Sequence, residues 1–391
     1  MNFDLREVSD KKTQRDFLEL PVKLYKNYPR WIRPLDNDIE SVFDPARNKQ
    51  FRHGKAIRWV LYSDDNAVVG RIAAFIDYET AKTSEQPTGG VGFFECIDNF
   101  DAASVLFNAA KAWLKDNGME AMDGPVNFGD RDRWWGLHVD GDFEPNYCMD
   151  YHLPYYRALF EKYGFKVYFN QYTYHRLVNS SDVNPAIWEK AVRVSQNPDY
   201  RVTIISKWKL NKFAEDFRTI YNNAWGRYTG VKKMSTTHAK VIMKTIKPIL
   251  DPKLMYFAYY QGEPIGFLIM VPDINQVVKY LNGKFNFWAK VKFLYLLKVK
   301  KVCTKAVGLI FGIVPQHQGK GLEGALVNEL AKRALKSGFQ YKELELNWIG
   351  DFNPTMRRIA EQIGAKIRKT HITFRYMFDR NREVVPPRKV S

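Results

Sequence analysis

The sequence predicts an α+β protein in which one unit occurs twice, each copy holding a mixed central sheet flanked by helices. Segment 154–173 aligns without a gap with segment 354–373. A second correspondence joins 66–77 to 262–273, and both segments read as strand, turn, strand. Internal similarity of this kind indicates a duplicated unit. The identical pairs in the first alignment are Pro154 and Pro354, Arg157 and Arg357, Glu161 and Glu361, Gly164 and Gly364, Lys166 and Lys366, and Thr173 and Thr373.

Each copy is expected to run as hairpin, long strand, helix, strand, helix and strand. The long strand of the first copy, 90–98, precedes a helical pattern over 102–118. That of the second, 307–314, precedes a helical pattern over 321–338. The repeated segment places proline at a helix start and glycine at its end, before the last strand.

The boundary between the copies is expected within 177–205, with a linker at 179–190. We therefore predict a first domain over 1–180 and a second over 190–391. A chain of 391 residues suits two domains of ordinary size.

Composition indicates a globular protein, because hydrophobic residues make up 45% of the chain and can fill large cores. The first residues are charged, and no run approaches the roughly 18 apolar residues of a spanning helix. Three widely spaced cysteines fit neither a disulfide framework nor a metal site, so no metal is expected. We expect a cytoplasmic protein.

The net charge of +17 predicts an anionic partner, which includes cofactor phosphates, a membrane surface and nucleic acid. The positive charge is concentrated, since no acidic residue lies between Asp273 and Glu323. Within this stretch, 284–302 carries apolar residues at helical spacing between lysines. It fits either a helix packed between the halves or a surface element on an anionic membrane at the inner face.

The junction of strand and helix in the second copy reads GIVPQHQGKGLEGAL, 312–326, and holds several glycines. Glycine lets backbone approach a ligand closely, and N–H groups at a helix start are unsatisfied, so the loop can cradle phosphate. The P-loop pattern fails because Leu322 follows Gly321, and the dinucleotide pattern matches only weakly. The first copy has CIDNFDAAS at this place, without glycine.

This loop resembles motif A of the GNAT superfamily of acyl-CoA N-acyltransferases, in a register anchored by Pro315. The resemblance implies tandem GNAT-type domains, the first degenerate, with acyl-CoA or acetyl-CoA bound by the second. Glu323 departs from the motif and is expected to point its carboxylate away from the pyrophosphate. The implied cofactor-binding residues are Ile313 and Val314 on the strand and Gln318, Gly319, Lys320, Gly321 and Leu322 in the loop.

Other segments resemble the bacterial ceramide synthase-like branch of that superfamily, which implies acyl transfer to a lipophilic, sphingoid-type amine. They are 17–35, 68–77, 90–98, 124–128, 312–326 and 345–353. The rival interpretations are a transferase that uses aminoacyl-tRNA and a non-catalytic module that binds nucleic acid or membrane. The intact CoA-type loop disfavours nucleic acid as a partner.

For catalysis, N-acylation calls for a base that removes the amine proton. Strand alternation puts Glu345 and Asn347 on one face of 342–349, and we select Glu345 as the base. The usual GNAT tyrosine is replaced by Ala360. Asn353 either bonds the pantetheine arm or caps the helix that starts at Pro354. The expected roles of His317 and His371 are structural.

Overall fold

The computed structural model describes residues 2–83, 86–129, 131–178, 184–225 and 233–387. The strands are β1 (Phe3–Glu7), β2 (Gly54–Ser63), β3 (Val68–Asp77), β4 (Thr88–Cys96), β5 (Ala121–Gly124), β6 (Leu137–Asp140), β7 (Lys166–Leu177), β8 (Tyr200–Ile204), β9 (Met255–Tyr260), β10 (Glu263–Pro272), β11 (Lys305–Ile313), β12 (Glu343–Gly350) and β13 (Lys366–Met377). The helices are α1 (Lys11–Leu24), α2 (Asp36–Val42), α3 (Tyr78–Thr83), α4 (Phe100–Asp116), α5 (Tyr156–Tyr163), α6 (Pro185–Gln196), α7 (Leu210–Trp225), α8 (Thr236–Ile246), α9 (Asn275–Val278), α10 (Phe287–Leu294), α11 (Leu322–Ala334) and α12 (Pro354–Gln362).

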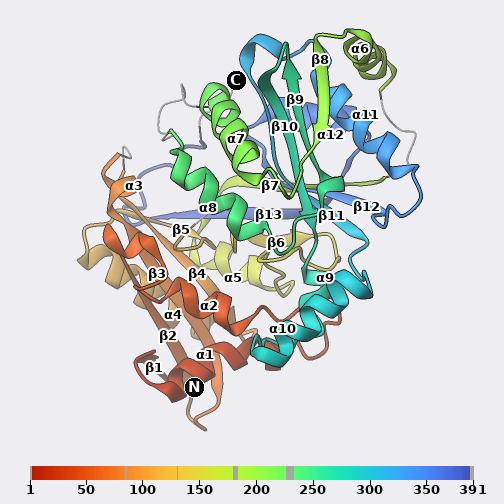
Figure 1. The fold of residues 1–391 in the computed structure, drawn as a ribbon. Coiled ribbons are helices and arrows are strands. Elements are labelled where there is room, and N and C mark those ends of the chain that lie inside the picture. Colours follow the sequence, from red (N-terminus) through yellow and green to blue (C-terminus); the bar gives the residue numbers. More distant parts are fainter. Residues whose placement is uncertain (1, 84–85, 130, 179–183, 226–232, 388–391) are drawn as a thin grey trace.

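The described strands form one continuous mixed sheet with helices on its faces, which confirms the predicted α+β class (Figure 1). Its order is β1-β2-β3-β4-β5-β13-β7-β12-β11-β10-β9-β8, with β6 beside β13. The last strand of each half therefore lies between two strands of the other half. Strand β13 pairs with β5 of the first half, and β7 pairs with β12 of the second.

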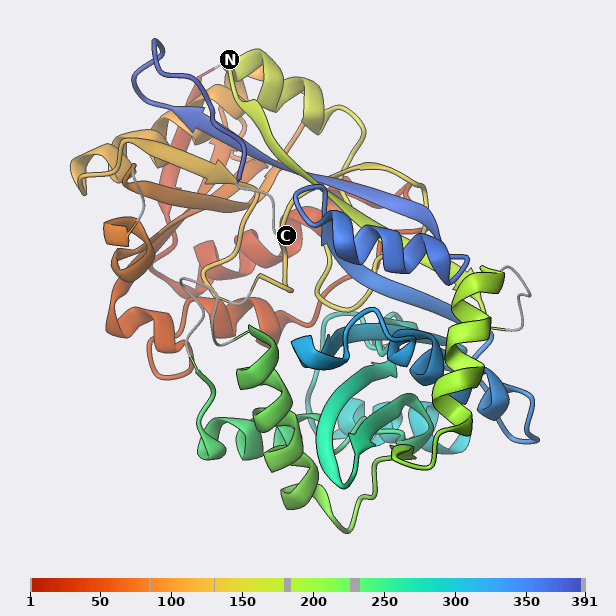
Figure 2. The same ribbon diagram turned by 90° about the horizontal axis from the view of Figure 1, so that it is seen from above.

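The exchanged strands β7 and β13 are also partners of each other, and they cross the middle of the molecule side by side (Figure 2). Gln171 lies opposite His371 in this antiparallel pair. These two residues are equivalents in the internal repeat, so the pair marks the local pseudo-twofold relation between the halves. The exchange makes two duplicated units into one sheet.

Local signals in the repeat form the helices that the sequence predicts. Helix α12 begins at Pro354, and Gly364 follows its end with a φ of 79°. Helix α5 is followed by Gly164, with a φ of 108°. Glycine adopts this left-handed conformation without steric cost, so it ends both helices and turns the chain into β7 and β13.

The predicted linker at 179–190 is wrong in part. Residues 179–183 lie outside the described residues, but α6 begins at Pro185 and continues to Gln196. Asn184 caps this helix through a bond from the Ala186 N–H to its side chain, with Pro185 in the first turn. Helix α6 packs along α11 of the second half, so residues 185–190 belong to a packed helix and not to a linker.

Each half has its own apolar core on its part of the sheet. That of the first half packs α4 and α5 on the strands through residues such as Phe107 and Phe160, both fully buried. That of the second packs α7 and α11 through Phe217, Phe267 and Leu326. Within the described residues, no helix is both long enough and apolar enough to cross a membrane.

Candidate functional site

Strands β11 and β12 pair only over their first residues and then diverge. Their parallel pairing runs from Lys305 with Glu343 to Gly308 with Leu346. Strand β11 continues along β10 to Ile313, with a register irregularity opposite Ile269 and Met270. Residues 309–313 therefore have an edge that no other described strand pairs with. We call this edge, with residues 347–350 of β12, the second divergence.

The two strand residues expected to bind the cofactor face opposite sides of β11. The Val314 N–H donates to the carbonyl of Ile265 on β10, at 2.9 Å. Because backbone groups alternate along a strand, those of Ile313 face the second divergence. The Ile313 carbonyl accepts a bond from the Gln318 side-chain amide at 2.8 Å. Among the described residues, no side chain bonds to the Ile313 N–H.

The loop after β11 lies directly before α11, and its use as an anion cradle stays a prediction. Gly319 has a φ of 71°, and a Cβ added there would meet nothing within 4 Å. Lys320 is exposed, whereas the Leu322 side chain is fully buried, which leaves only its backbone for a ligand.

Glu323 points into this loop, so the expectation that it points away is wrong. Its Oε1 accepts the Gly319 N–H at 3.0 Å. The carboxylate lies in the first turn of α11, where the helix dipole favours negative charge. It therefore holds one of the N–H donors that a phosphate oxygen would use.

Gly321 is required here by packing. Its φ is 99°, and a Cβ added there would lie 2.8 Å from the Lys190 carbonyl oxygen on α6. Any larger residue would displace α6 from the start of α11. The geometry thus explains this glycine without a ligand, and its place in a cofactor site stays a prediction.

At the start of α12, Asn353 acts as a cap. Its Oδ1 accepts a hydrogen bond from the Met356 N–H at 3.1 Å, so this oxygen caps α12, as one of the two predicted alternatives has it. Ala360, where the usual tyrosine is missing, is fully buried among apolar residues of α12 and β12. A bond between Asn353 and a pantetheine arm stays a prediction.

Glu345 is fully buried in a cluster of charged side chains on β12 and its neighbours. Its carboxylate is 2.7 Å from Lys369 Nζ, 3.2 Å from Arg368 Nη1 and 3.6 Å from Lys305 Nζ. Lys305 in turn lies 3.0 Å from Asp273 Oδ2. The cluster joins β12 to β13 through Lys369 and to β11 through Lys305. Removing one partner would leave an uncompensated buried charge, so these contacts oppose separation of the strands.

This surrounding changes the proton affinity of Glu345. Burial alone would raise its pKa, but Lys369, Lys305 and Arg368 outweigh burial and lower the pKa to about 2. A general base works best when its pKa lies near the operating pH. Its burial and low pKa describe a structural anion, and its assignment as the base stays a prediction.

Loops of the first half contact the second half at β12 and at the charge cluster around Glu345. The Trp348 indole N–H donates to the Arg131 carbonyl at 3.0 Å, and the Tyr147 N–H donates to Asp273 at 3.3 Å. Lys369 Nζ also bonds the Glu144 carbonyl, at 3.1 Å. The composition of 130–136, charged and aromatic, is the one sign of the first loop in the sequence, and nothing in the sequence marks the loop of Glu144 and Tyr147. The Arg131 contact lies late in β12, whereas the contacts of Glu144 and Tyr147 lie at Lys369 and Asp273.

The first half has a divergence of its own, at residues 93–96 of β4, and it is filled by protein. Strand β4 pairs with β5 only as far as Gly90 with Asp123. The Cys96 N–H donates to Tyr156 Oη at 3.0 Å, and the Tyr155 hydroxyl donates to the Cys96 carbonyl at 2.7 Å. Cys96 corresponds to Ile313, because each pairs with the equivalent glycine of its hairpin.

The buried side chain of Glu95 bonds to Tyr156, one of the tyrosines that close this edge. Glu95 accepts bonds from Tyr156 at 2.7 Å and Tyr25 at 2.9 Å, and lies 3.5 Å from Arg71 Nη2. The second half has Gly312 at the position of Glu95 and Thr355 and Met356 at those of the tyrosines. The internal repeat contained this difference, and comparing the unlike positions would have found it.

The two histidines have structural surroundings. His317 Nδ1 lies 3.0 Å from the Tyr200 hydroxyl, and its ring packs against Tyr260. His371 is 1% exposed, and its Nε2 lies 3.1 Å from the Asp150 carbonyl. Burial lowers the pKa of both imidazoles.

The sequence of this chain is similar to those of known proteins over most of its length. No protein-family model matches the chain. It is 26% identical over 93% of its length to Protein YghO of Escherichia coli, covering 92% of that protein. It is also 26% identical over 91% of its length to a protein of Caulobacter vibrioides named bacterial ceramide synthase, again covering 92% of it.

Solved structures give the fold. A tandem GNAT protein from the clavulanic acid biosynthesis pathway matches 96% of this chain and 99% of its own, with a TM-score of 0.54 at 10% identity. A GCN5-related glucosamine N-acetyltransferase region of a fungal multi-domain enzyme matches 96% of this chain and 38% of its own, with a TM-score of 0.56 at 10% identity. The chain therefore has the tandem GNAT fold, and its resemblance to the ceramide synthase-like branch is confirmed as a sequence similarity.

Proposed function

We propose that the protein is an N-acyltransferase that moves an acyl group from acyl-CoA to an amine, with CoA bound by the second half. One observation carries the proposal: the edge of β11 at Ile313 is open beside a glycine loop, whereas the matching edge at Cys96 is closed by two tyrosines. An open strand edge can pair with the amide groups of a pantetheine arm. The similarity to a protein named bacterial ceramide synthase supports the same activity.

In this proposal the chain binds CoA mainly with backbone. Ile313 pairs with the arm, and the N–H groups of Gly319, Lys320 and Gly321 bind the pyrophosphate. Glu323 leaves the Gly319 N–H when the phosphate arrives, because both anions require the same donor. The bound thioester supplies the activated acyl group, and the protein holds it against the acceptor amine.

We further propose that the first half, 1–180, is a degenerate copy that shapes the acceptor site of the second, 190–391. The loop contacts of Arg131 with Trp348 and of Tyr147 with Asp273 support this role. The first contact lies at Trp348, late in β12, and the second lies beside the start of β11, so first-half loops border the second half on the side from which we propose that the acceptor approaches.

The surface of segment 284–302 supports a lipophilic acceptor. Helix α10 and the π-helical turn after it bury Phe293 and Leu297 but expose apolar side chains on the other face. Phe287 is 69% exposed and Trp288 75%. Asp36 of the first half donates its N–H to the carbonyl of Gly283, directly before this segment, at 2.8 Å. The other exposed apolar residues are Val291, Leu294, Tyr295 and Val299.

We propose that this exposed face, with its lysines, contacts an anionic membrane surface from which the acceptor is taken. The lysines contribute about 1 kcal/mol each near such a surface. Co-sedimentation with anionic vesicles should fall at high salt and after Lys290, Lys292, Lys298 and Lys300 are changed together to Gln. Absence of binding to anionic vesicles at low salt would remove the membrane from the proposal and leave the transferase intact.

The activity itself is tested with purified protein, palmitoyl-CoA or acetyl-CoA, and a panel of amines that includes a sphingoid base. Mass spectrometry should detect the N-acyl product, and calorimetry should detect CoA binding. A protein that binds tRNA but not CoA would favour the aminoacyl-tRNA alternative. One that binds neither and forms no product would refute the proposal.

A further inference from the structure

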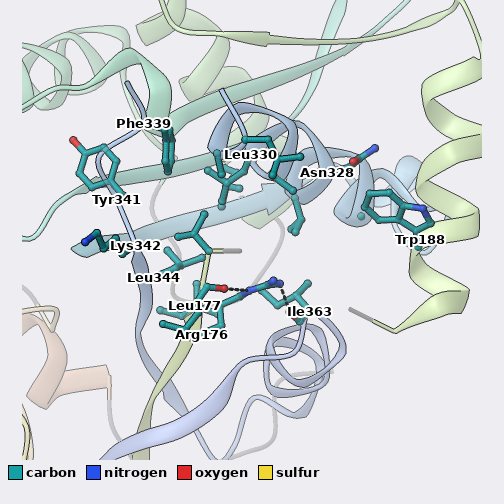
Figure 3. Close-up of a pocket in the computed structure, with 18 of the residues that line it drawn as sticks. Arg176, Leu177, Trp188, Asn328, Leu330, Phe339, Tyr341, Lys342, Leu344 and Ile363 are labelled. Carbon is teal, nitrogen blue, oxygen red and sulfur yellow. Dashed lines mark hydrogen bonds between the residues drawn. The ribbon is translucent and has the colours of Figure 1, made fainter. Parts of the chain in front are cut away.

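A cavity of about 1010 Å³ lies beneath α11 in the second half (Figure 3). Helix α6, the end of β7 and the start of β12 form its other walls. Its lining begins at Gly324 in the first turn of α11 and continues to Leu335, just past the end of that helix. At 1.5 Å per residue, this part of the helix is roughly 16 Å long. The cavity is thus long as well as large.

Aliphatic and aromatic side chains dominate the walls, and they come from elements far apart in sequence. Strand alternation directs Leu344 and Leu346 of β12 into the cavity, while Glu345 points to the opposite face. Phe339 and Tyr341 lie toward one end of the view in Figure 3, and Trp188 lies toward the other. Pockets for small ligands are built in this way, with apolar walls and few polar groups.

Asn328 and Arg176 are polar side chains within these walls. Asn328 of α11 is 4% exposed, and its Oδ1 has no hydrogen-bond partner among the described residues. Arg176 of β7 is largely buried, and its guanidinium bonds the carbonyls of Ile363 and Leu177. A buried acceptor without a partner carries a desolvation cost, so a donor from a ligand would be favoured at Asn328.

Apolar lining residues also reach the surface. Leu335 is 84% exposed, Leu177 51% and Trp188 45%. An apolar cavity whose lining extends to exposed apolar residues gives hydrocarbon a continuous path from solvent. Glu189 and Lys342 are the charged residues that line it besides Arg176.

We propose that this cavity binds one long alkyl chain of an amphiphile, with a hydroxyl or amide N–H of the ligand donating to Asn328 Oδ1. The apolar walls provide the affinity, and Asn328 selects ligands that carry the donor. A fatty acid, a long-chain acyl-CoA and a long-chain amine share the alkyl chain, whereas the carboxylate of a fatty acid carries no donor for Asn328 Oδ1. The inference goes beyond the proposed function, because the cavity contains none of the loop residues 315–321 and binding calls for no acyl transfer.

Trp188 provides a reporter, because bromine atoms on a bound chain quench a nearby indole. Palmitate brominated along its chain should quench part of the fluorescence, and Trp188→Phe should remove that part. Unlabelled palmitate, palmitoyl-CoA and hexadecylamine then compete for the site, and their order identifies the source of the chain.

Filling the cavity supplies the decisive comparison. The double variant Ala331→Leu, Ala334→Leu should weaken brominated palmitate roughly tenfold or more, because overpacking opposes the ligand. Lys332→Leu, on the exposed face of α11, is the matched control and should bind as the wild type does. CoA affinity is measured in all variants, so that loss of the chain site is distinguished from loss of the CoA loop.

Asn328→Leu tests the polar contact. Without ligand its Tm should rise, because a buried unpaired amide is removed, and it should lose any preference for hydroxylated over plain chains. The proposal is overturned if the wild type shows no quenching, if Trp188→Phe quenches equally, or if the filled variant binds like the control. Equal preference of wild type and Asn328→Leu would overturn the role of Asn328.

Discussion

Both halves of the molecule stop pairing their two parallel strands early, yet they treat the freed edge of the strand in opposite ways. In the first half, Tyr155 and Tyr156 bond to both backbone groups of Cys96. In the second, among the described residues, the corresponding Ile313 has only its carbonyl engaged, by Gln318. The duplicated backbone therefore forms the same strand divergence twice, and side chains close one of the two edges.

The difference shows that side chains can close a divergent strand edge without loss of the fold. Buried backbone groups where two strands diverge need a hydrogen-bond partner, since leaving such a group unpaired costs free energy. Tyrosine hydroxyls supply that partner in the first half, and Glu95 bonds to Tyr156 and to Tyr25. In the second half, no described side chain supplies a partner for the Ile313 N–H, and we propose that a ligand does. Four predictions test this comparison, beginning with the largest effect.

Breaking the ion cluster of the second half should have the largest effect. Glu345→Gln leaves Lys369 and Lys305 without their buried carboxylate, so stability should fall by about 3–5 kcal/mol in urea titration. Because the folded pKa is lowered to about 2, the stabilisation is complete above the ordinary carboxyl pKa of about 4.3 and is lost as pH falls toward 2. A variant as stable as the wild type but with roughly hundredfold lower turnover would restore Glu345 as the base.

The second prediction transfers the closed edge to the open half. Thr355→Tyr with Met356→Tyr should place hydroxyls at Ile313 and weaken CoA roughly tenfold or more, as measured by calorimetry. The reciprocal change, Tyr155→Phe with Tyr156→Phe, should cost about 1–3 kcal/mol in stability and leave CoA affinity unchanged. If CoA affinity responds to the first-half change instead, the assignment of the halves is reversed.

The third prediction concerns Gly319, which has open space around it and a φ of 71°. Gly319→Asn keeps a residue that tolerates this conformation but places a side chain in the phosphate loop, so CoA affinity should fall about tenfold. Gly118→Asn is the matched control, since Gly118 has a φ of 82° and equally open surroundings in the first half. Equal CoA affinity in the two variants would exclude the loop.

The smallest effect is expected at Glu323. Glu323→Ala frees the Gly319 N–H, so CoA should bind a few-fold more tightly, in line with one hydrogen bond of about 0.5–1.5 kcal/mol. The gain should vanish for ligands without phosphate, such as pantetheine. Weaker CoA binding would show instead that the carboxylate holds the loop in its binding shape.

Much of the site could be predicted from local patterns. The glycine loop, the caps at Asn353 and Gly364 and the repeat are all short-range features, and the described structure contains each of them. The direction of Glu323 could not be predicted, because it depends on one loop conformation that brings its carboxylate to an N–H four residues earlier. The packing of Lys190 on Gly321 depends on a helix that the composition of 179–190 concealed.

The sequence by itself determined that the protein is a duplication, which copy keeps the glycine loop, and that the tyrosines at 155 and 156 have no counterparts at 355 and 356. Only the tertiary structure decided that β7 and β13 cross between the halves, because strand pairing over such distances leaves no mark on local periodicity. That crossing brings Lys369 to Glu345 and buries the pair. The carboxylate that the sequence predicts as the base therefore lies among buried ion-pair partners that join strands of the sheet.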